Sequence, residues 1–259
     1  LLFHCFDDGT AEVRCSDYHD TREMDIVIPE TVEADGKTYT VTSIGDEVFG
    51  YEINSITLPN TIRRIGNYAF YGSGLTSITL PESLEEIGEG AFKSMGLSTV
   101  TIPEGVKEIS KSAFQDNESL TTVVLPSHLE RIGESAFTGC SSLASISLPS
   151  TLKSIGSSAF SFDFALASIN IPESVEEIGE EAFKFSGLTS LTLPKGITKV
   201  PYGLLSSCIK LTEVVIQDGV KEIGWYAFNG CTKLVSVTLP EGLESIGEGA
   251  FQSCGKLTS

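Results

Sequence analysis

The segment Leu143-Ala-Ser-Ile-Ser-Leu-Pro-Ser-Thr-Leu-Lys-Ser-Ile-Gly-Ser-Ser-Ala-Phe160 recurs with small changes from residue 53 to the end of the chain. Its template is L-x-x-I-x-L-P-x-x-L-x-x-I-G-x-x-A-F, followed by a short polar run and the next leucine. The last residue of the template returns every 21 to 23 residues, at Phe49, Phe70, Phe92, Phe114, Phe137, Phe160, Phe183, Leu205, Phe228 and Phe251. A fixed period of this size predicts a solenoid, in which each repeat buries its apolar side only against its neighbours.

Each repeat is predicted to contain one strand. The segment 77–80 alternates polar and apolar residues and contains β-branched side chains, which is typical of a strand with one buried face. Its apolar residues should point inward, and Ser77 and Thr79 outward. Pro81 should end the strand because proline lacks the amide donor that a sheet requires.

The rest of the repeat is predicted to return to the core and turn. Leu84 and Ile87 should lie along a short extended segment, and Gly88 should allow a tight corner. Residues 90–93 are expected to form one helical turn, with Phe92 filling the interior. The predicted fold is therefore a curved leucine-rich-repeat solenoid with repeats of 22–23 residues.

Residues 1–45 do not carry the repeat and are predicted to form an N-terminal β-hairpin cap. Residues 2–6 and 11–15 have the character of strands and flank a turn that contains Asp-Gly, a strong hairpin signal. A solenoid needs such an atypical end unit to cover its first repeat. The solenoid itself is predicted over 46–259.

The sequence stops inside a repeat and begins with Leu1, without a signal-peptide pattern. We therefore expect it to be a piece of a longer protein whose export signal or anchor lies outside it.

Composition excludes several classes of function. The chain has 17 basic and 35 acidic residues and a formal charge of −18. Such a surface repels phosphate backbones and anionic lipids, which excludes nucleic acid as a partner. Membrane insertion is also excluded for this segment, because no apolar run approaches the roughly 18 residues that a spanning helix needs.

Four of the six cysteines share one position of the repeat, three residues after its core residue: Cys140, Cys208, Cys231 and Cys254. We favour buried thiols over disulfides within the set Cys208, Cys231 and Cys254, because parallel side chains of stacked repeats rarely aim their Cβ atoms at one another. Cys5 and Cys15 flank the predicted hairpin, and the sequence leaves open whether they pair.

The repeat resembles a known family. L-x-x-I-x-L is the strand signature of leucine-rich repeats, and the longer form I-x-L-P-x-x-L-x-x-I-G-x-x-A-F-x-x-C resembles the BspA-like class of bacterial cell-surface proteins. The segments 6–13, 26–32 and 35–45 are similar to the usual N-terminal portion of that class. The resemblance implies export to the surface of an anaerobic, host-associated bacterium and a role in adhesion or host-protein binding. It transfers no binding residues, because the class has no shared ligand motif.

No arrangement of residues predicts catalysis, and no cofactor or metal is expected. The three histidines, His4, His19 and His128, each stand alone. Glutamate pairs such as Glu85-Glu86, Glu176-Glu177 and Glu180-Glu181 fall at outward positions of the repeat. The glycines follow the repeat period, so they do not form a phosphate-binding loop.

Two kinds of position are candidates for ligand contact. The outward strand positions form a hydroxyl-rich, nearly uncharged face, which includes Ser77, Thr79, Thr99, Thr101, Ser145, Ser147, Ser190 and Thr192. This face is either a polar concave surface for a protein or glycan, or simply a set of residues that suit exposed strands, and we favour the second interpretation.

Aromatic residues at normally polar positions are the other candidates. Phe162 and Phe185 share one position in adjacent repeats, and are either an exposed anchor or packed locally with Phe164. Trp225 and Tyr226 form a second candidate patch. Together with the resemblance, which implies the surface location and the host partner, these residues predict a non-enzymatic, secreted or cell-surface binding module for a host or extracellular-matrix protein. The alternative is a spacer or stalk that displays other domains of a longer surface protein.

Overall fold

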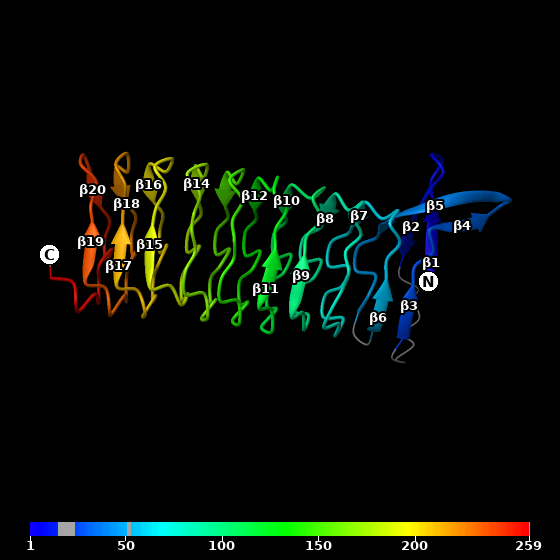
Figure 1. Cartoon of the computed structure of the whole chain (residues 1–259), viewed down its shortest axis with the longest axis horizontal. Helices are drawn as coiled ribbons and strands as arrows, with labels where there is room; N and C mark the ends of the chain where they lie inside the picture. The colour runs from blue at the N-terminus through cyan, green and yellow to red at the C-terminus, as the bar shows by residue number, and fades with distance from the viewer. Residues whose placement is uncertain (15–23, 51–52, 259) are drawn as a thin grey trace.

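The computed structural model describes residues 1–14, 24–50 and 53–258. The chain winds into a solenoid with its two termini at opposite ends (Figure 1). The strands of successive repeats stack in parallel, as each repeat covers the one before it. The predicted solenoid of parallel strands is confirmed.

One wall of the solenoid, the strand face, is built from the L-x-x-I-x-L segments. Its strands are β6 (Ile53–Thr57), β9 (Thr99–Thr101), β11 (Thr122–Val124), β15 (Ser190–Thr192), β17 (Glu213–Val215) and β19 (Ser236–Thr238). β9 pairs with β11, and β15, β17 and β19 form one sheet. Inward residues such as Val100 and Leu191 are buried, while the residues beside them are exposed.

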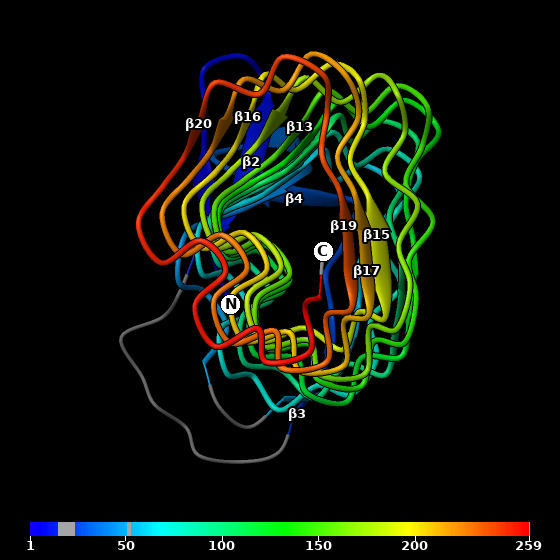
Figure 2. The same cartoon turned by 90° about the vertical axis from the view of Figure 1, so that its left-hand side faces the viewer.

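A second wall, the I-G face, is built from the residues that precede the glycine of each I-G pair. Its strands are β7 (Arg64–Ile65), β8 (Glu86–Ile87), β10 (Glu108–Ile109), β12 (Arg131–Ile132), β13 (Ser154–Ile155), β14 (Glu177–Ile178), β16 (Lys199–Val200), β18 (Glu222–Ile223) and β20 (Ser245–Ile246). Seen along the axis, β13, β16 and β20 lie across the interior from β15, β17 and β19 (Figure 2).

The N-terminal strands close the first end of the solenoid. They are β1 (Leu2–Cys5), β2 (Thr10–Arg14), β3 (Met24–Val27), β4 (Thr31–Ala34) and β5 (Lys37–Ile44). β1 and β2 form the predicted antiparallel hairpin. β2 pairs with β5 and β5 with β7, while β3 pairs with β6, so the cap extends both walls. The boundary at residue 45 stays a prediction.

Phenylalanine fills the interior, as the sequence predicts. The core phenylalanines of the internal repeats are fully buried, and neighbouring rings stack with centroids 5.0 to 5.7 Å apart. Leu205 interrupts the column between Phe183 and Phe228, and it is buried as well. Rings thus pack against rings on both sides of Leu205, which is itself buried, so the core is continuous along the axis.

The predicted helical turn is not confirmed, because the described part of the chain contains no helix. The segment around residues 88–93 consists instead of hydrogen-bonded turns. In these turns the amide of Ala91 donates to the carbonyl of Gly88, and the amide of Lys93 donates to the carbonyl of Gly90. The backbone is left-handed two residues before the core residue in every repeat, for example at Glu47, Tyr68 and Gly90, with φ of 54°, 52° and 58°. A right-handed helix cannot pass through such a residue.

A second left-handed position lies two residues after the core residue, at Gly72, Ser94, Asp116, Gly139, Phe162, Phe185, Ser207, Gly230 and Ser253. Between the two positions, alternate amides of the turn donate to carbonyls of the next repeat, as Phe92 does to Ala113 at 2.9 Å. The turn thus continues the hydrogen bonding between repeats that the strands provide on the two walls.

The glycine of the I-G pair serves close packing rather than a tight corner. Gly88 and Gly156 have no positive φ, so the backbone conformation there would allow a residue with a side chain. A Cβ added at Gly156 would lie 2.5 Å from the backbone of Gly133 and Glu134, and one at Gly179 would lie 2.2 Å from Ser157 N. Only glycine allows successive repeats to approach so closely.

Two repeats carry another residue in place of the I-G glycine, and the sheet of the I-G face is interrupted at both of them. The sheet ends at β8 and restarts at β10, where Ser110 follows the strand, and it ends at β14 and restarts at β16, where Pro201 follows. At Gly133 the backbone amide donates to Ile109 O at 2.7 Å. Ser110 bonds the corresponding carbonyl of Ile87 through its hydroxyl, at 2.5 Å. Proline has no amide to donate.

The cysteine column consists of buried thiols, as we favoured. Cys140, Cys208, Cys231 and Cys254 are free, and each thiol donates to the carbonyl of the core residue in the preceding repeat, at 3.0 to 3.3 Å. Burial raises the pKa of Cys208 to about 11, so this thiol keeps its proton. Cys5 is free and half-buried, while Cys15 lies outside the described residues.

Replacing Phe137 by alanine should lower the free energy of unfolding by about 3–5 kcal/mol, because it leaves a cavity between two stacked rings. Urea titration followed by circular dichroism measures this loss. Phe164→Ala is the matched control, because Phe164 is 53% exposed. An equal loss in the two variants would contradict the phenylalanine core.

Gly156→Ala should destabilise the solenoid by at least about 1–3 kcal/mol, because its methyl group overlaps the backbone of the preceding repeat. Gly255→Ala should have little effect, since nothing lies within 4 Å of a Cβ added there. Thermal unfolding compares the two variants, and equal melting temperatures would refute the close-packing role of the I-G glycine.

Candidate interaction surfaces

The hydroxyl-rich positions of the strand face are exposed, as predicted. Thr99 and Thr101 lie on β9, and Ser190 and Thr192 lie on β15. The other predicted hydroxyl residues are exposed in segments of the same wall: Ser77, Thr79, Ser145 and Ser147. The structure therefore gathers all eight on one wall, and their role in binding stays a prediction.

Neighbouring hydroxyls on this wall have a structural use. The side chains of Thr121, Thr189 and Thr212 each donate to a backbone carbonyl of the preceding repeat, at 2.9 to 3.2 Å. These residues directly precede strand positions and fasten one repeat to the next. Part of the hydroxyl content of the wall is thus explained by stacking, which agrees with the interpretation that we favoured.

The I-G face carries charged side chains that pair between repeats. One position of this face lies two residues before the isoleucine of the I-G pair. Along much of the stack, basic and acidic residues alternate at this position: Arg63, Glu85, Lys107, Glu130, Lys153 and Glu176. Arg63 lies 2.8 Å from Glu85, and farther along Lys221 lies 3.5 Å from Glu244. Each pair is exposed and contributes little alone, but like charges in register would oppose the stacking.

Of the predicted glutamate pairs, Glu85-Glu86 takes part in this pattern. Glu85 and Glu86 are exposed and pair with Arg63 and Arg64 of the preceding repeat. Glu181 pairs with Lys184 at 2.7 Å. Glu85, Glu86 and Glu181 therefore form ion pairs on the surface.

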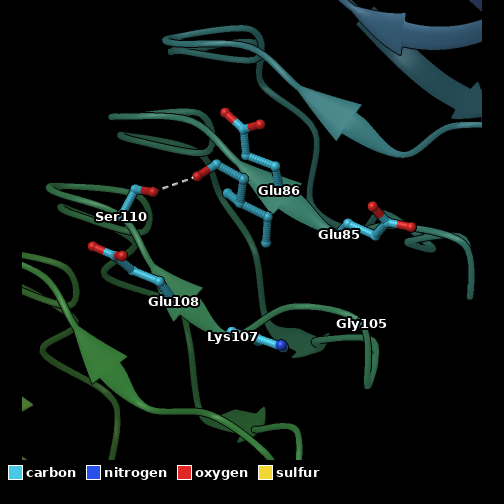
Figure 3. Close-up of a pocket in the computed structure, with 7 residues that line it drawn as sticks. Glu85, Glu86, Gly105, Lys107, Glu108 and Ser110 are labelled. Carbon is cyan, nitrogen blue, oxygen red and sulfur yellow. Dashed lines mark hydrogen bonds between the residues drawn. The ribbon is translucent and has the colours of Figure 1, made fainter. Parts of the chain in front are cut away.

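An open groove of about 700 Å³ lies where β8 and β10 separate (Figure 3). Glu85 and Lys107 project to one side of it, and Glu86 and Glu108 to the other. Glu86 is bound by Arg64, and Glu108 lies 3.8 Å from Arg131. The groove lies where Ser110 stands in place of the I-G glycine, and Ser110 is part of its lining.

The aromatic edge, which we define as Phe162, Phe164, Phe185 and Ile209, is a set of apolar side chains at the turns of three successive repeats. Phe162, Phe164 and Ile209 are 42%, 53% and 58% exposed, and Phe185 is half-buried. The rings of Phe162 and Phe185 stack with centroids 4.8 Å apart, and Phe164 meets Phe162 edge-on at 6.2 Å. Phe162 thus packs with Phe164 and is also exposed, and its role as an anchor for a partner stays a prediction.

Tight packing and two lysines hold the aromatic edge in place. A Cβ at Gly187 would lie 2.2 Å from Phe164 O, and the Gly187 amide donates to Asp163 O at 3.0 Å. Lys210 donates to Phe164 O across the intervening repeat, at 3.1 Å. The Lys184 ammonium lies 5.8 Å from the centre of the Phe185 ring.

The second predicted patch is partly structural. Trp225 is 59% exposed, and its ring covers Gly247 of the next repeat, while Tyr226 covers Gly249 in the same way. Tyr202 meets Tyr226 edge-on at 6.1 Å. Trp225 and Tyr226 therefore fill space beside glycines, and only part of their surface is available to a partner.

Sequence reasoning missed Phe164, Ile209 and Tyr202 as exposed residues. Phe164 and Ile209 lie four residues after a core residue, where the other repeats from Phe70 onward carry Gly, Ser, Glu or Thr. Comparison of that column across the repeats, as was done for Phe162 and Phe185, would have identified both. Within the described ranges, no group of three or more His, Cys, Asp and Glu side chains could hold a metal ion. The same ranges contain no helix long and apolar enough to cross a membrane.

Comparison with known proteins agrees with the geometry. Residues 42–164 and 154–259 match the model of the BspA type leucine-rich repeat region. A search of the curated proteins gives no match. Among solved structures, a leucine-rich repeat protein from Bacteroides ovatus is 26% identical, with a TM-score of 0.64 over 99% of this chain and 91% of that one.

Two further solved structures share the fold. A leucine-rich cell surface protein from Faecalibacterium prausnitzii is 27% identical, with a TM-score of 0.52 over 99% of this chain and 91% of that one. The pneumococcal vaccine antigen PcpA is 20% identical, with a TM-score of 0.72 over 95% of this chain and 75% of that one, and at this identity it supports the fold alone.

Proposed function

Because the chain belongs to the BspA type leucine-rich repeat family, we propose that it is a non-enzymatic binding module at a bacterial surface that adheres to a host or extracellular-matrix protein. The Faecalibacterium relative is described as a cell surface protein, which supports an extracellular location. Leucine-rich repeats present long, rigid surfaces that suit protein recognition.

The aromatic edge is the observation that carries this proposal. Its rings are exposed on a molecule whose other walls carry hydroxyls and paired charges. Clusters of aromatic side chains supply most of the binding energy at many protein interfaces, and Phe162 and Phe185 are already held in one arrangement by stacking. The cost of ordering them on binding is therefore small.

The charges beside the edge indicate the kind of partner. Lys210 lies next to Ile209 and reaches Phe164, in a molecule whose net charge is −18. A protein that inserts apolar side chains between these rings and places a carboxylate near Lys210 would match the edge in shape and charge. Stacking of a sugar ring on Phe164 is the glycan alternative.

A spacer is the second candidate function. The phenylalanine column and the backbone hydrogen bonds run through the stack without help from a partner, which suits a rigid stalk. A stalk does not require exposed aromatic side chains, so the aromatic edge favours the binding module.

The test is a binding screen of the purified protein against extracellular-matrix proteins and host glycans at physiological salt. Phe162→Ser/Phe185→Ser should weaken binding at least about thirtyfold, the effect of losing a hot spot of about 2 kcal/mol. Serine is compatible with the left-handed backbone there, since Ser94, Ser207 and Ser253 occupy the same position with φ of 55°, 62° and 63°.

Two control variants locate the contact. Thr99→Ala/Thr101→Ala on the strand face and Trp225→Ser in the second patch should bind like the wild type. Full affinity in the double phenylalanine variant would reject the aromatic edge, and a loss confined to the threonine variant would move the contact to the strand face. The absence of any ligand in the screen would favour the spacer.

A further inference from the structure

Asp163 is a buried acid directly beneath the aromatic edge. It is 0% exposed, although Phe162 and Phe164 on either side of it are exposed. Neither of its carboxylate oxygens has a hydrogen-bond partner. A buried, unpaired carboxylate is costly, so the protonation state of this group decides how stable the segment 161–165 is.

Asp163 lies in a column whose residues donate hydrogen bonds to the preceding repeat in five other repeats, although Ser73 and Met95, which share the column, make no such bond. The column is the position three residues after the core residue, which Asn117 and the four buried cysteines also occupy. The Asn117 amide donates to Phe92 O at 2.8 Å, and the Cys140 thiol donates to Phe114 O at 3.3 Å. By the same spacing, the carbonyl that faces Asp163 belongs to Phe137. A neutral carboxylic acid can donate to it, whereas a carboxylate cannot.

The groups around Asp163 offer no compensating charge. The Cys140 thiol faces it from the preceding repeat and Ser186 occupies the column in the next, where its hydroxyl lies 3.3 Å from the Cys208 sulfur. Lys184 is held by Glu181, and Lys210 is bound to the Phe164 carbonyl. Burial raises the pKa of Asp163 well above its usual range, and the backbone amide of Cys140 opposes this to a smaller extent.

We propose that Asp163 makes the aromatic edge sensitive to pH: the neutral acid donates to Phe137 O and keeps residues 161–165 packed, and ionisation releases them. When the proton leaves, the carboxylate must reach water, and Phe162 and Phe164 move with it. The consequence for binding rests on the proposed function, because it assumes that the partner contacts this edge. The structural change itself requires no partner.

The direction of the pH effect follows from the linkage between proton binding by Asp163 and the equilibrium between packed and open states. The pKa is raised in the packed state and returns toward about 3.9 when the segment opens. The packed state is therefore favoured most below that value. The population of the packed state relative to the open state falls by up to tenfold per pH unit as the pH rises toward the pKa of Asp163 in the packed state. A partner that binds the packed edge should bind more tightly in acid.

Hydrogen exchange of the amides in residues 161–166, corrected for intrinsic rates, tests the proposal between about pH 4 and pH 8 on the protein alone. Protection in the wild type should fall as the pH rises, by up to tenfold per unit. Asp163→Asn should abolish this dependence, because asparagine is neutral and Asn117 makes the same bond elsewhere in the column. Asp163→Cys, which copies Cys140, is a second neutral donor for the same comparison.

Asp116→Asn is the matched control, because Asp116 is exposed at the position next to this column and its loss should leave the pH dependence of the wild type unchanged. Protection that does not vary with pH in the wild type, or that varies equally in Asp163→Asn, would overturn the proposal. Failure to find a partner would reject the proposed function alone, since the exchange measurement involves the protein without ligand.

Discussion

The fold depends on how closely successive repeats approach at the I-G glycine. Where glycine is present, backbone atoms of adjacent repeats come within a distance that no side chain allows, and the amide of the glycine bonds the preceding repeat. The same rise separates the strands and brings the phenylalanine rings into contact at 5.0 to 5.7 Å, and it is kept at Ser110, where Phe92 and Phe114 lie 5.3 Å apart. Strands, turns and core therefore share one constraint, the rise from one repeat to the next.

Much of the fold was predictable because stacking forces equal positions into equal environments. The period, the inward strand residues, the phenylalanine core, the hairpin of β1 and β2 and the buried cysteine column all follow from that rule. The turn was not predicted correctly, because its left-handed positions are occupied by Glu47, Tyr68 or Ser112 as readily as by glycine. Hydrogen bonding between repeats, and not local preference, imposes that conformation.

The candidate surface was predictable only where a residue differs in type from those at the same position of the other repeats. Phe162 and Phe185 stood out for this reason, and the structure places their rings in contact. Asp163 escaped notice because an acid in a polar loop is usually exposed, although it occupies the column in which the four cysteines were expected to be buried. The aromatic edge combines both cases, with exposed rings above a buried acid. Phe162, Asp163 and Phe185, each of an unexpected type for its column, thus lie in two adjacent repeats.

The interruptions of the I-G face also have a mechanical meaning. Continuous backbone hydrogen bonding along a wall makes a solenoid behave as a stiff rod, and the wall is continuous within β10, β12, β13 and β14 and within β16, β18 and β20. At Ser110 and Pro201 one wall lacks this connection, while the turns continue to bond across both places. A bending load would therefore concentrate at these two joints. The aromatic edge begins in the stiff middle segment and reaches the joint at Pro201, so the direction in which its rings face would change as the rod flexes.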